Sequence, residues 1–436
     1  MDRKNQKFGL WTASAFVIAN MIGTGVFTSL GFQLATTENF VAIMILWLIG
    51  GVIALCGALV YGELSSVMPR SGGEYHFLSS LYSPMMGFLA GWISLIVGFA
   101  APVALASMAF SSYAGALIPW MSPTLMAVIV LTLVTLFHGF SLRLSGGLQG
   151  ILTVIKIVVI VTFIILGFAL PGERQPIVSE SLGSFSMKDI LSTGFAVSII
   201  WVYYAYSGWN ASAYIVDDIK NPQHTLPRSL LYSTLFVTIL YMLLNAVFLL
   251  STPTSELTGQ VEIGLISAKH LFGTGIGNMM GAVIALLLLS SISSMVFVGP
   301  RVSFRMGEEH KLLRFLSRKS KTGVPISALL FQYALSLIMI LTGSFKFLTE
   351  YTGILLSLCS LLTVIGVFIH RKRFPDMKRP FKTPLYPVTP ILFCIPILFS
   401  VFYLFKSNIL NLAISAGTLI VGVILYFIEK KFCHEK

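Results

Sequence analysis

The sequence predicts an all-α integral membrane protein with about twelve transmembrane helices, judged from its composition and from the length of its apolar segments. Of the 436 residues, 56% are hydrophobic and only 11% are charged, a composition far from that of soluble proteins. A helix needs about 20 apolar residues to cross a bilayer core. Segments of that length recur throughout, so we expect one membrane domain over residues 1–436. They lie near residues 9–34, 40–62, 84–118, 122–142, 147–170, 190–215, 229–251, 276–300, 325–343, 347–370, 387–406 and 409–428.

The basic residues indicate how these spans are oriented. With the N-terminus inside, most of the 29 lysine and arginine residues fall on one side, including seven from Arg301 to Lys321 and six from Arg371 to Lys382. The other side receives Arg174, Lys188, Lys269, Lys346 and Lys406. This asymmetry follows the positive-inside rule and predicts that both termini are cytoplasmic. The net charge of +12 therefore reflects membrane topology, and we expect no nucleic-acid partner.

The cysteines give no sign of a metal or redox site. The four of them are scattered through spans and the C-terminal tail, with no CxxC pair and no metal-ligand spacing: Cys56, Cys359, Cys394 and Cys433. We expect unpaired apolar side chains, no metal and no cofactor.

The first apolar segment contains an interruption at Gly23-Thr24-Gly25. Each glycine weakens a helix by about 1 kcal/mol relative to alanine. A break here would leave free backbone groups in the middle of the bilayer, where only protein, water or a ligand can satisfy them. The alternative is an unbroken helix whose small residues pack against a neighbour.

A second interruption, Tyr206-Ser207-Gly208, lies in the sixth segment, five spans later. An odd number of spans per repeat inverts the second copy, so the two broken helices would face each other. Paired glycine-interrupted spans at matching positions are typical of transporter substrate sites. The pairing favours two functional breaks over a packing face.

The predicted breaks offer two kinds of backbone group. The second half of span one would begin near Val26, so the amides of Gly23, Thr24 and Gly25 would form the positive end of a helix, suited to a carboxylate. Free carbonyls at Met21 and Ile22, and from Tyr204 to Ser207 beside Gly208, would suit an ammonium. Together they match the zwitterion of an α-amino acid.

Lys156 is the charged residue that we place deep in a span, ten residues from Gly146 and fourteen from Leu170. At about 1.5 Å per residue it lies too far from either end to reach water easily. An intramembrane charge is costly and is usually functional. Lys156 would bind carbonyls freed by the first break, replace a bound sodium ion, or titrate during transport.

Further polar and aromatic side chains flank the breaks. Ser290 and Ser291, followed by Ser294, provide hydroxyls on span eight, although such serines commonly bond their own helix. Tyr204, Tyr206 and Trp209 lie in mid-span and would close over a substrate. In the loop 61–78 we expect Glu63, Arg70 and Glu74 to pair with one another, with no acid at the centre of any span.

With these features the chain resembles the amino acid–polyamine–organocation (APC) transporter superfamily, and its L-type amino acid transporter branch in particular. The resemblance covers about two thirds of the chain in order. It rests on ANMIGTGVF (19–27), GELSSVMPRSGGEY (62–75), IKIVVI (155–160), AYSGWNAS (205–212), IKNPQHTLPRSL (219–230) and SSISSMVFVGPR (290–301).

The resemblance implies a leucine-transporter-like five-plus-five inverted repeat with broken helices 1 and 6. Repeat one would cover about 9–170, repeat two about 188–370, and two extra helices about 387–430. It further implies that the substrate carboxylate binds the Gly23–Gly25 amides and that the amino group binds carbonyls near Met21 and Tyr204–Ser207.

The resemblance also implies roles for individual side chains. Tyr204 would be the outer aromatic gate, and Lys156 would stand near a sodium position, opposite Ser290 and Ser291. The side-chain pocket would include Ala90, Gly91 and Leu95 of span three, together with Trp209 and Met295.

One departure concerns partners. Heterodimeric members of the family use a cysteine in the loop between spans three and four, whereas the loop PWMSP (119–123) has none. We therefore expect no disulfide-linked heavy chain.

The resemblance and the residues together predict a carrier in the plasma membrane that moves neutral L-α-amino acids by alternating access. Sodium-independent exchange is the first expectation. Proton-coupled uptake through a titrating Lys156 stays open. A channel or an amino acid sensor is the alternative of a different class, but we find neither charged rings nor a soluble output domain. We expect no enzyme activity.

Overall fold

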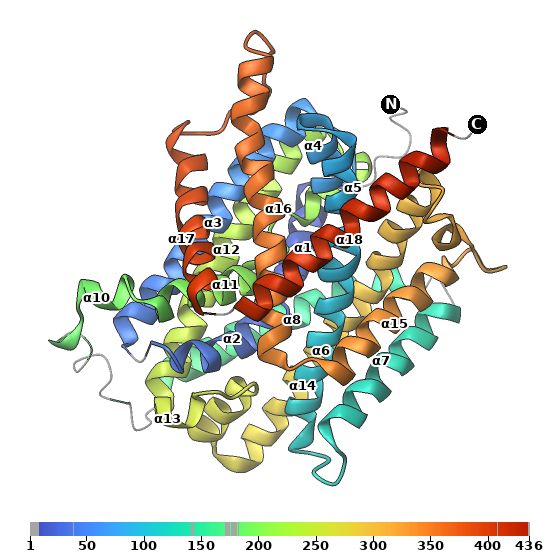
Figure 1. Ribbon diagram of the computed structural model, residues 1–436. Helices are drawn as coiled ribbons and strands as arrows, with labels where there is room; N and C mark the ends of the chain where they lie inside the picture. Colours follow the sequence, from blue (N-terminus) through green and yellow to red (C-terminus); the bar gives the residue numbers. More distant parts are fainter. Residues whose placement is uncertain are drawn as a thin grey trace.

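A computed structural model describes residues 8–37, 39–140, 144–170, 175, 181, 183–407 and 409–434. Over these residues the chain is a single bundle of helices (Figure 1). Eight helices are long and apolar enough to cross a membrane, and four shorter apolar helices accompany them, which together match the twelve expected spans. The uninterrupted spans are α3 (Phe40–Val67), α7 (Pro123–Phe140), α8 (Leu144–Ala169), α12 (Pro222–Ser251), α15 (Ile326–Thr342), α16 (Phe345–Arg373), α17 (Val388–Ser407) and α18 (Ile409–His434).

Span one is broken, as predicted. Helix α1 (Leu10–Met21) ends before the glycine pair, and α2 (Gly25–Leu34) begins at its second glycine. The N–H of Gly23 turns back to the Met21 carbonyl at 2.8 Å, which ends the helical hydrogen-bond pattern. The prediction of a break is therefore confirmed, and the alternative of an unbroken helix with a small-residue packing face is wrong.

Span six is also broken, but the part after the break contains less regular helix than we expected. Helix α11 (Thr193–Tyr206) ends at the interruption, where Gly208 takes a φ of +93° that side chains other than glycine rarely adopt. Two 3₁₀ turns follow, Ala211–Tyr214 and Val216–Asp218. The apolar segment 190–215 therefore contains one membrane helix of 14 residues and a tightly wound continuation.

Span three contains a third irregularity, which the sequence reading did not anticipate. It consists of α5 (Pro84–Ile93), a π-helical stretch over Ser94–Ala100, and α6 (Ala101–Gly115). Pro102 has no N–H to donate, and its ring would crowd the carbonyl one turn earlier. A π-helical turn widens the backbone at that point, and such turns are common at functional sites.

The connection between spans seven and eight contains short helical structure. Helix α13 (Thr254–Leu257) comes first, and α14 (Ile263–Glu309) follows. The first part of α14 is separated from the span itself by a kink at Gly273, where φ is +78°. Other short helices among the described residues are α4 (Glu74–Leu81), α10 (Met187–Ile190) and a 3₁₀ turn at Arg314–Ser317.

Both ends of the described chain lie at one face of the bundle, which we call the terminal face. Hydrogen bonds connect the segments there in sequence. They join Phe8 to Asp218, Asp217 to Ser71, Tyr75 to Glu309, and the amides of Lys311 and Leu312 to Glu429. An even number of spans between the two ends explains why they meet at the same face.

Glu63, at the terminal-face end of α3, corrects one expectation. Its fully buried carboxylate pairs with Arg371 at 2.6 Å and with Arg379 at 3.2 Å, and it accepts the amide of Thr383 at 2.7 Å. It therefore ties α3 to α16 and the segment after it, rather than to Arg70 and Glu74.

Candidate functional site

The two breaks touch each other in the middle of the bundle. A Cβ built on Gly25 would lie 2.3 Å from the Cα of Ala205, and one built on Gly208 would lie 2.7 Å from the carbonyl oxygen of Asn20. Real carbon atoms do not approach so closely, so only glycine permits either crossing. The two glycines thus let the broken helices meet backbone to backbone.

Free amides are present at the start of α2. The N–H groups of Thr24, Gly25 and Val26 form no hydrogen bond with any part of the chain that the structure describes. They lie at the N-terminal end of a helix, where its dipole is positive. Of these three residues, Thr24 and Gly25 line the central cavity, so their amides can donate to an anionic group there. The Gly23 amide, which we expected to take part, is already bonded to the Met21 carbonyl.

The acceptors at the breaks differ in part from those that we expected. The Met21 carbonyl already accepts from Gly23 and from the Tyr241 hydroxyl at 2.6 Å, and the Tyr204 carbonyl accepts from Ser207 at 3.0 Å. The carbonyls without a partner among the described residues, on the parts of the breaks that line the cavity, include those of Asn20, Tyr203 and Ala205. On the first break the free carbonyl is thus that of Asn20 rather than Met21, and on the second break it is that of Ala205, within the expected range, together with that of Tyr203, one residue before it.

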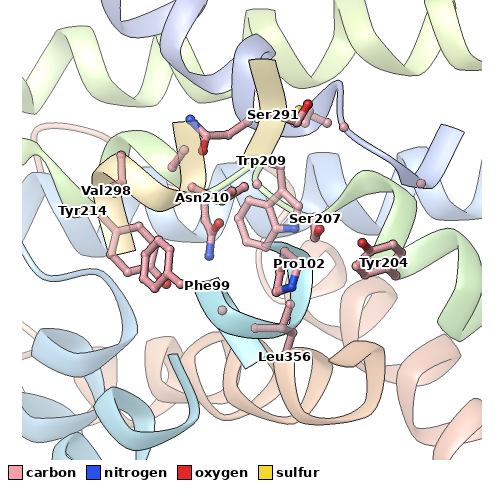
Figure 2. Close-up of a pocket in the computed structure, with 18 of the residues that line it drawn as sticks. Phe99, Pro102, Tyr204, Ser207, Trp209, Asn210, Tyr214, Ser291, Val298 and Leu356 are labelled. Carbon is pink, nitrogen blue, oxygen red and sulfur yellow. The ribbon is translucent and has the colours of Figure 1, made fainter. Parts of the chain in front are cut away.

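The cavity between the breaks has a volume of about 130 Å³. Figure 2 shows Tyr204 at one end of the view, Tyr214 and Phe99 at the other, and Asn210 and Trp209 between them. Its walls come from α1, α2, α4, α6, α11, α14, α16, the π-helical stretch and the segment after α11. The lining residues that lie between the breaks and the terminal face include Phe16, Asn20, Glu74, Asn210, Tyr214 and Ile215.

The aromatic residues of span six divide into two groups. Tyr204 lines the cavity and its hydroxyl lies 2.7 Å from that of Thr24, which closes the contact between the breaks on the side away from the terminal face. Trp209 also lines the cavity. Tyr206 does not, because its ring packs against Trp47 and Tyr241 and its hydroxyl donates to the Trp47 carbonyl at 3.1 Å.

Lys156 reaches the first break from α8. Its side chain is buried, and its Nζ donates to the Ile22 carbonyl at 3.3 Å and to the Ser291 hydroxyl at 2.8 Å. Ile22 therefore meets the lysine rather than the cavity. Ser291 lines the cavity, whereas the Ser290 hydroxyl is buried and forms no hydrogen bond within the described chain.

The span-three pocket residues are corrected by the structure. Ala90, Gly91 and Leu95 do not line the cavity. A Cβ on Gly91 would lie 2.7 Å from Met306, and Leu95 packs in an apolar cluster with Met306 and Phe88. The π-helical turn brings a different set to the cavity: Ser94, Gly98, Phe99, Pro102 and Ala106. Met295 of α14 does line it, as expected.

Glu74 is the charged residue of the cavity lining, and the sequence did not indicate that it lies there. It is the first residue of α4 and is 4% exposed. Glu74 begins a short helix and does not lie at the centre of a span, so it does not contradict the expectation of no acid at a span centre, but it does place an acid at the cavity wall. The sequence feature that could have indicated this position is an acid directly after Gly72-Gly73, because two glycines allow a loop to turn inward. That feature does not indicate which residues the loop contacts.

The site has the parts that binding of a zwitterion needs: amides for a carboxylate, carbonyls for an ammonium, and a cavity between them.

Residues 8–428 match the amino acid permease family. The serine/threonine exchanger SteT of Bacillus subtilis is 29% identical, over 98% of this chain and 97% of its own. The mouse (Mus musculus) b(0,+)-type amino acid transporter 1 is 29% identical, over 89% of this chain and 80% of its own. The human (Homo sapiens) large neutral amino acids transporter small subunit 2 is 28% identical, over 99% of this chain and 81% of its own. Because the family match spans nearly the whole sequence, the chain belongs to the amino acid permease family of the APC superfamily.

Proposed function

We propose that this permease exchanges small neutral L-α-amino acids across the plasma membrane by alternating access, without sodium. The observation that supports this most directly is the pairing of unbonded amides at Thr24, Gly25 and Val26 with unbonded carbonyls on the facing break. The amides bind the substrate carboxylate and the carbonyls of Asn20, Tyr203 and Ala205 bind its ammonium. Both ends of the zwitterion are then recognised, whatever the side chain.

The size of the cavity supports a small side chain. An apolar cavity of about 150 Å³ holds one benzene molecule, which has six heavy atoms. A cavity of about 130 Å³ is slightly smaller, so it favours the smallest amino acids, of which alanine has six heavy atoms, serine seven and threonine eight. Larger substrates require the walls to move.

The polarity of the lining supports a neutral substrate. Glu74 is its charged residue, and its carboxylate already accepts from Tyr61, Asn210, Tyr214 and Ser360. A carboxylate has about four acceptor positions, so these donors leave none free for a cationic side chain.

Lys156 supports sodium independence. Its ammonium bridges the first break and Ser291 of α14, the kind of oxygen-lined position that a bound cation would take. A fixed positive charge there replaces the metal ion.

The second candidate for the mode of transport is proton-coupled uptake through Lys156. The Ile22 carbonyl and the Ser291 hydroxyl leave one of the three N–H groups of the ammonium unused, so a neutral amine would lose little hydrogen bonding.

The charge distribution supports a cytoplasmic terminal face, since the basic segments 301–321 and 371–382 flank α14 and α16 at that face. We further propose that the protein works without a disulfide-linked heavy chain, because the segment 119–123 between α6 and α7 contains no cysteine.

The test is counterflow in proteoliposomes that contain the purified full chain. Labelled serine should accumulate when unlabelled serine is inside, equally in sodium and in choline buffer, and alanine or threonine should compete better than arginine. Arginine outcompeting alanine, serine and leucine would contradict the neutral assignment. Accumulation driven by a proton gradient alone would select the proton-coupled alternative, and a sodium requirement would contradict the role of Lys156.

A further inference from the structure

Glu74 is a buried carboxylate at the cavity wall, bonded to neutral groups. It accepts from the Tyr61 hydroxyl at 2.8 Å, from Nδ2 of Asn210 at 2.6 Å, from the Tyr214 hydroxyl, and from the Ser360 hydroxyl at 3.4 Å. The donors come from α3, from the segment after α11 and from α16. No lysine, arginine or histidine of the described chain forms an ion pair with it.

A carboxylate held in this way fixes the direction of every hydrogen bond that it makes. Ionised, it can only accept, so each neighbour must turn a donor toward it. For a hydroxyl this costs little, because the oxygen keeps its own acceptor positions. For an asparagine it decides which end of the amide faces the acid and which end faces away.

Asn210 is the neighbour for which this matters. Its Nδ2 is held by Glu74, so its Oδ1 points elsewhere, and no hydrogen bond to Oδ1 forms within the described residues. Asn210 itself lines the cavity. Figure 2 shows it between Tyr214 and Trp209, both of which also line the cavity. The amide therefore presents an unused acceptor next to the substrate position.

We propose that Glu74 is a positioning residue for substrate recognition: it locks the Asn210 amide so that Oδ1 accepts a hydrogen bond from a donor on the substrate. The donor is an N–H of the ammonium or an O–H of a hydroxyl side chain, which share this chemistry. The proposal rests on the proposed function, since it concerns the same cavity and amino acid substrates.

The carboxylate is needed because glutamine at position 74 would not enforce this orientation. Glutamine offers one acceptor end and one donor end, and the Asn210 amide can satisfy it either way round. When Nε2 of the glutamine faces Asn210, the asparagine turns its own oxygen inward and the cavity loses its acceptor. The remaining bond is also between neutral groups, which are about half as strong as charge-assisted ones.

The test compares four proteins in proteoliposome counterflow: wild type, Glu74→Gln, the control Glu308→Gln, and the exchange variant Glu74→Gln/Asn210→Asp. Glu308→Gln makes the same chemical change in an exposed pair with Arg305, away from the cavity. Glu74→Gln should raise the half-saturating serine concentration by about three- to five-fold, the scale of exchanging a charge-assisted for a neutral hydrogen bond. Glu308→Gln should leave it within about two-fold.

The exchange variant separates positioning from structural support. In that variant the introduced glutamine amide donates to the introduced aspartate, whose second oxygen still faces the cavity as an acceptor. Serine affinity should therefore return to within about two-fold of wild type. Comparing serine with alanine identifies the donor. Equal loss of both in Glu74→Gln assigns the ammonium, and selective loss of serine assigns the hydroxyl.

Several results would overturn the inference. If Glu74→Gln lowers the maximal rate and the thermal unfolding midpoint but leaves the half-saturating concentration unchanged, Glu74 is structural. If the exchange variant binds serine no better than Glu74→Gln, Asn210 is not the group that Glu74 orients. If the wild type transports serine and no variant changes its affinity, the role of Glu74 is rejected but the proposed function stands. If the wild type moves no amino acid, the proposed function itself is rejected.

Discussion

Replacing Gly25 by alanine tests whether the two broken helices must meet backbone to backbone. The added Cβ would lie 2.3 Å from the Cα and 2.8 Å from the Cβ of Ala205. Carbon atoms prefer separations of about 3.5–4.0 Å, so the breaks would have to move apart by more than about 1 Å. Because the nearest atom belongs to the backbone, no side-chain rotation can relieve the contact.

The energetic cost follows from two opposing terms. Forcing extra volume into a packed interior costs about 1–3 kcal/mol, and a backbone obstacle belongs at the upper end of that range. Replacing a helical glycine by alanine recovers up to about 1 kcal/mol. We therefore expect Gly25→Ala to lower the free energy of unfolding by about 1–2 kcal/mol. The amides of Thr24, Gly25 and Val26 would shift with the backbone, so serine affinity should fall at least about ten-fold, equivalent to about 1.4 kcal/mol.

Gly23→Ala is the matched control for stability. The nearest atom to a Cβ at that position is the Met21 carbonyl oxygen, 4.0 Å away, and the backbone φ is not positive. We expect its thermal unfolding midpoint to equal or exceed that of the wild type. The assays are thermal unfolding of the purified protein in detergent and serine counterflow in proteoliposomes. A Gly25→Ala protein that is as stable as Gly23→Ala and transports serine normally would refute the close crossing.

Three further substitutions probe other contacts. Lys156→Met should reduce counterflow more than ten-fold, roughly the loss of a charge-assisted hydrogen bond, and unchanged transport and pH dependence would reject the lysine as the cation at the break. Tyr204→Phe removes the 2.7 Å contact with Thr24 and should weaken serine binding by up to about ten-fold, measured as the half-saturating concentration; wild-type affinity would mean that the contact does not shape the site. Glu63→Gln leaves Arg371 and Arg379 without their shared carboxylate and should destabilise the protein by about 2–3 kcal/mol, below the range for fully buried pairs. The control Glu308→Gln breaks an exposed pair and should leave the unfolding midpoint unchanged; equal effects of the two substitutions would argue against a buried clamp at Glu63.

The spans, the two breaks and the intramembrane lysine were all accessible from the sequence. Each is a local property: hydropathy over about 20 residues, glycines in the middle of an apolar run, and one charge far from either end of its span. Their positions along the chain were therefore predictable within a few residues. The exception is span six, where the helix ends at Tyr206 although apolar residues continue, because hydropathy does not distinguish an α-helix from 3₁₀ turns.

Hydropathy and the glycine interruptions were sufficient to predict the class of membrane protein and the two segments that carry free backbone groups in mid-membrane. Which of those groups stay free depends on contacts between distant parts of the chain. Tyr241 comes from α12 to occupy the Met21 carbonyl, the π-helical turn rotates Ser94 and Phe99 into the cavity in place of Ala90 and Gly91, and the loop before α4 delivers Glu74. These partners are far apart in the chain, and hydrogen bonds between distant residues leave no periodic trace in a sequence. Packing between distant segments therefore decides which groups line the cavity, whereas the local composition of the sequence decides where the two breaks occur.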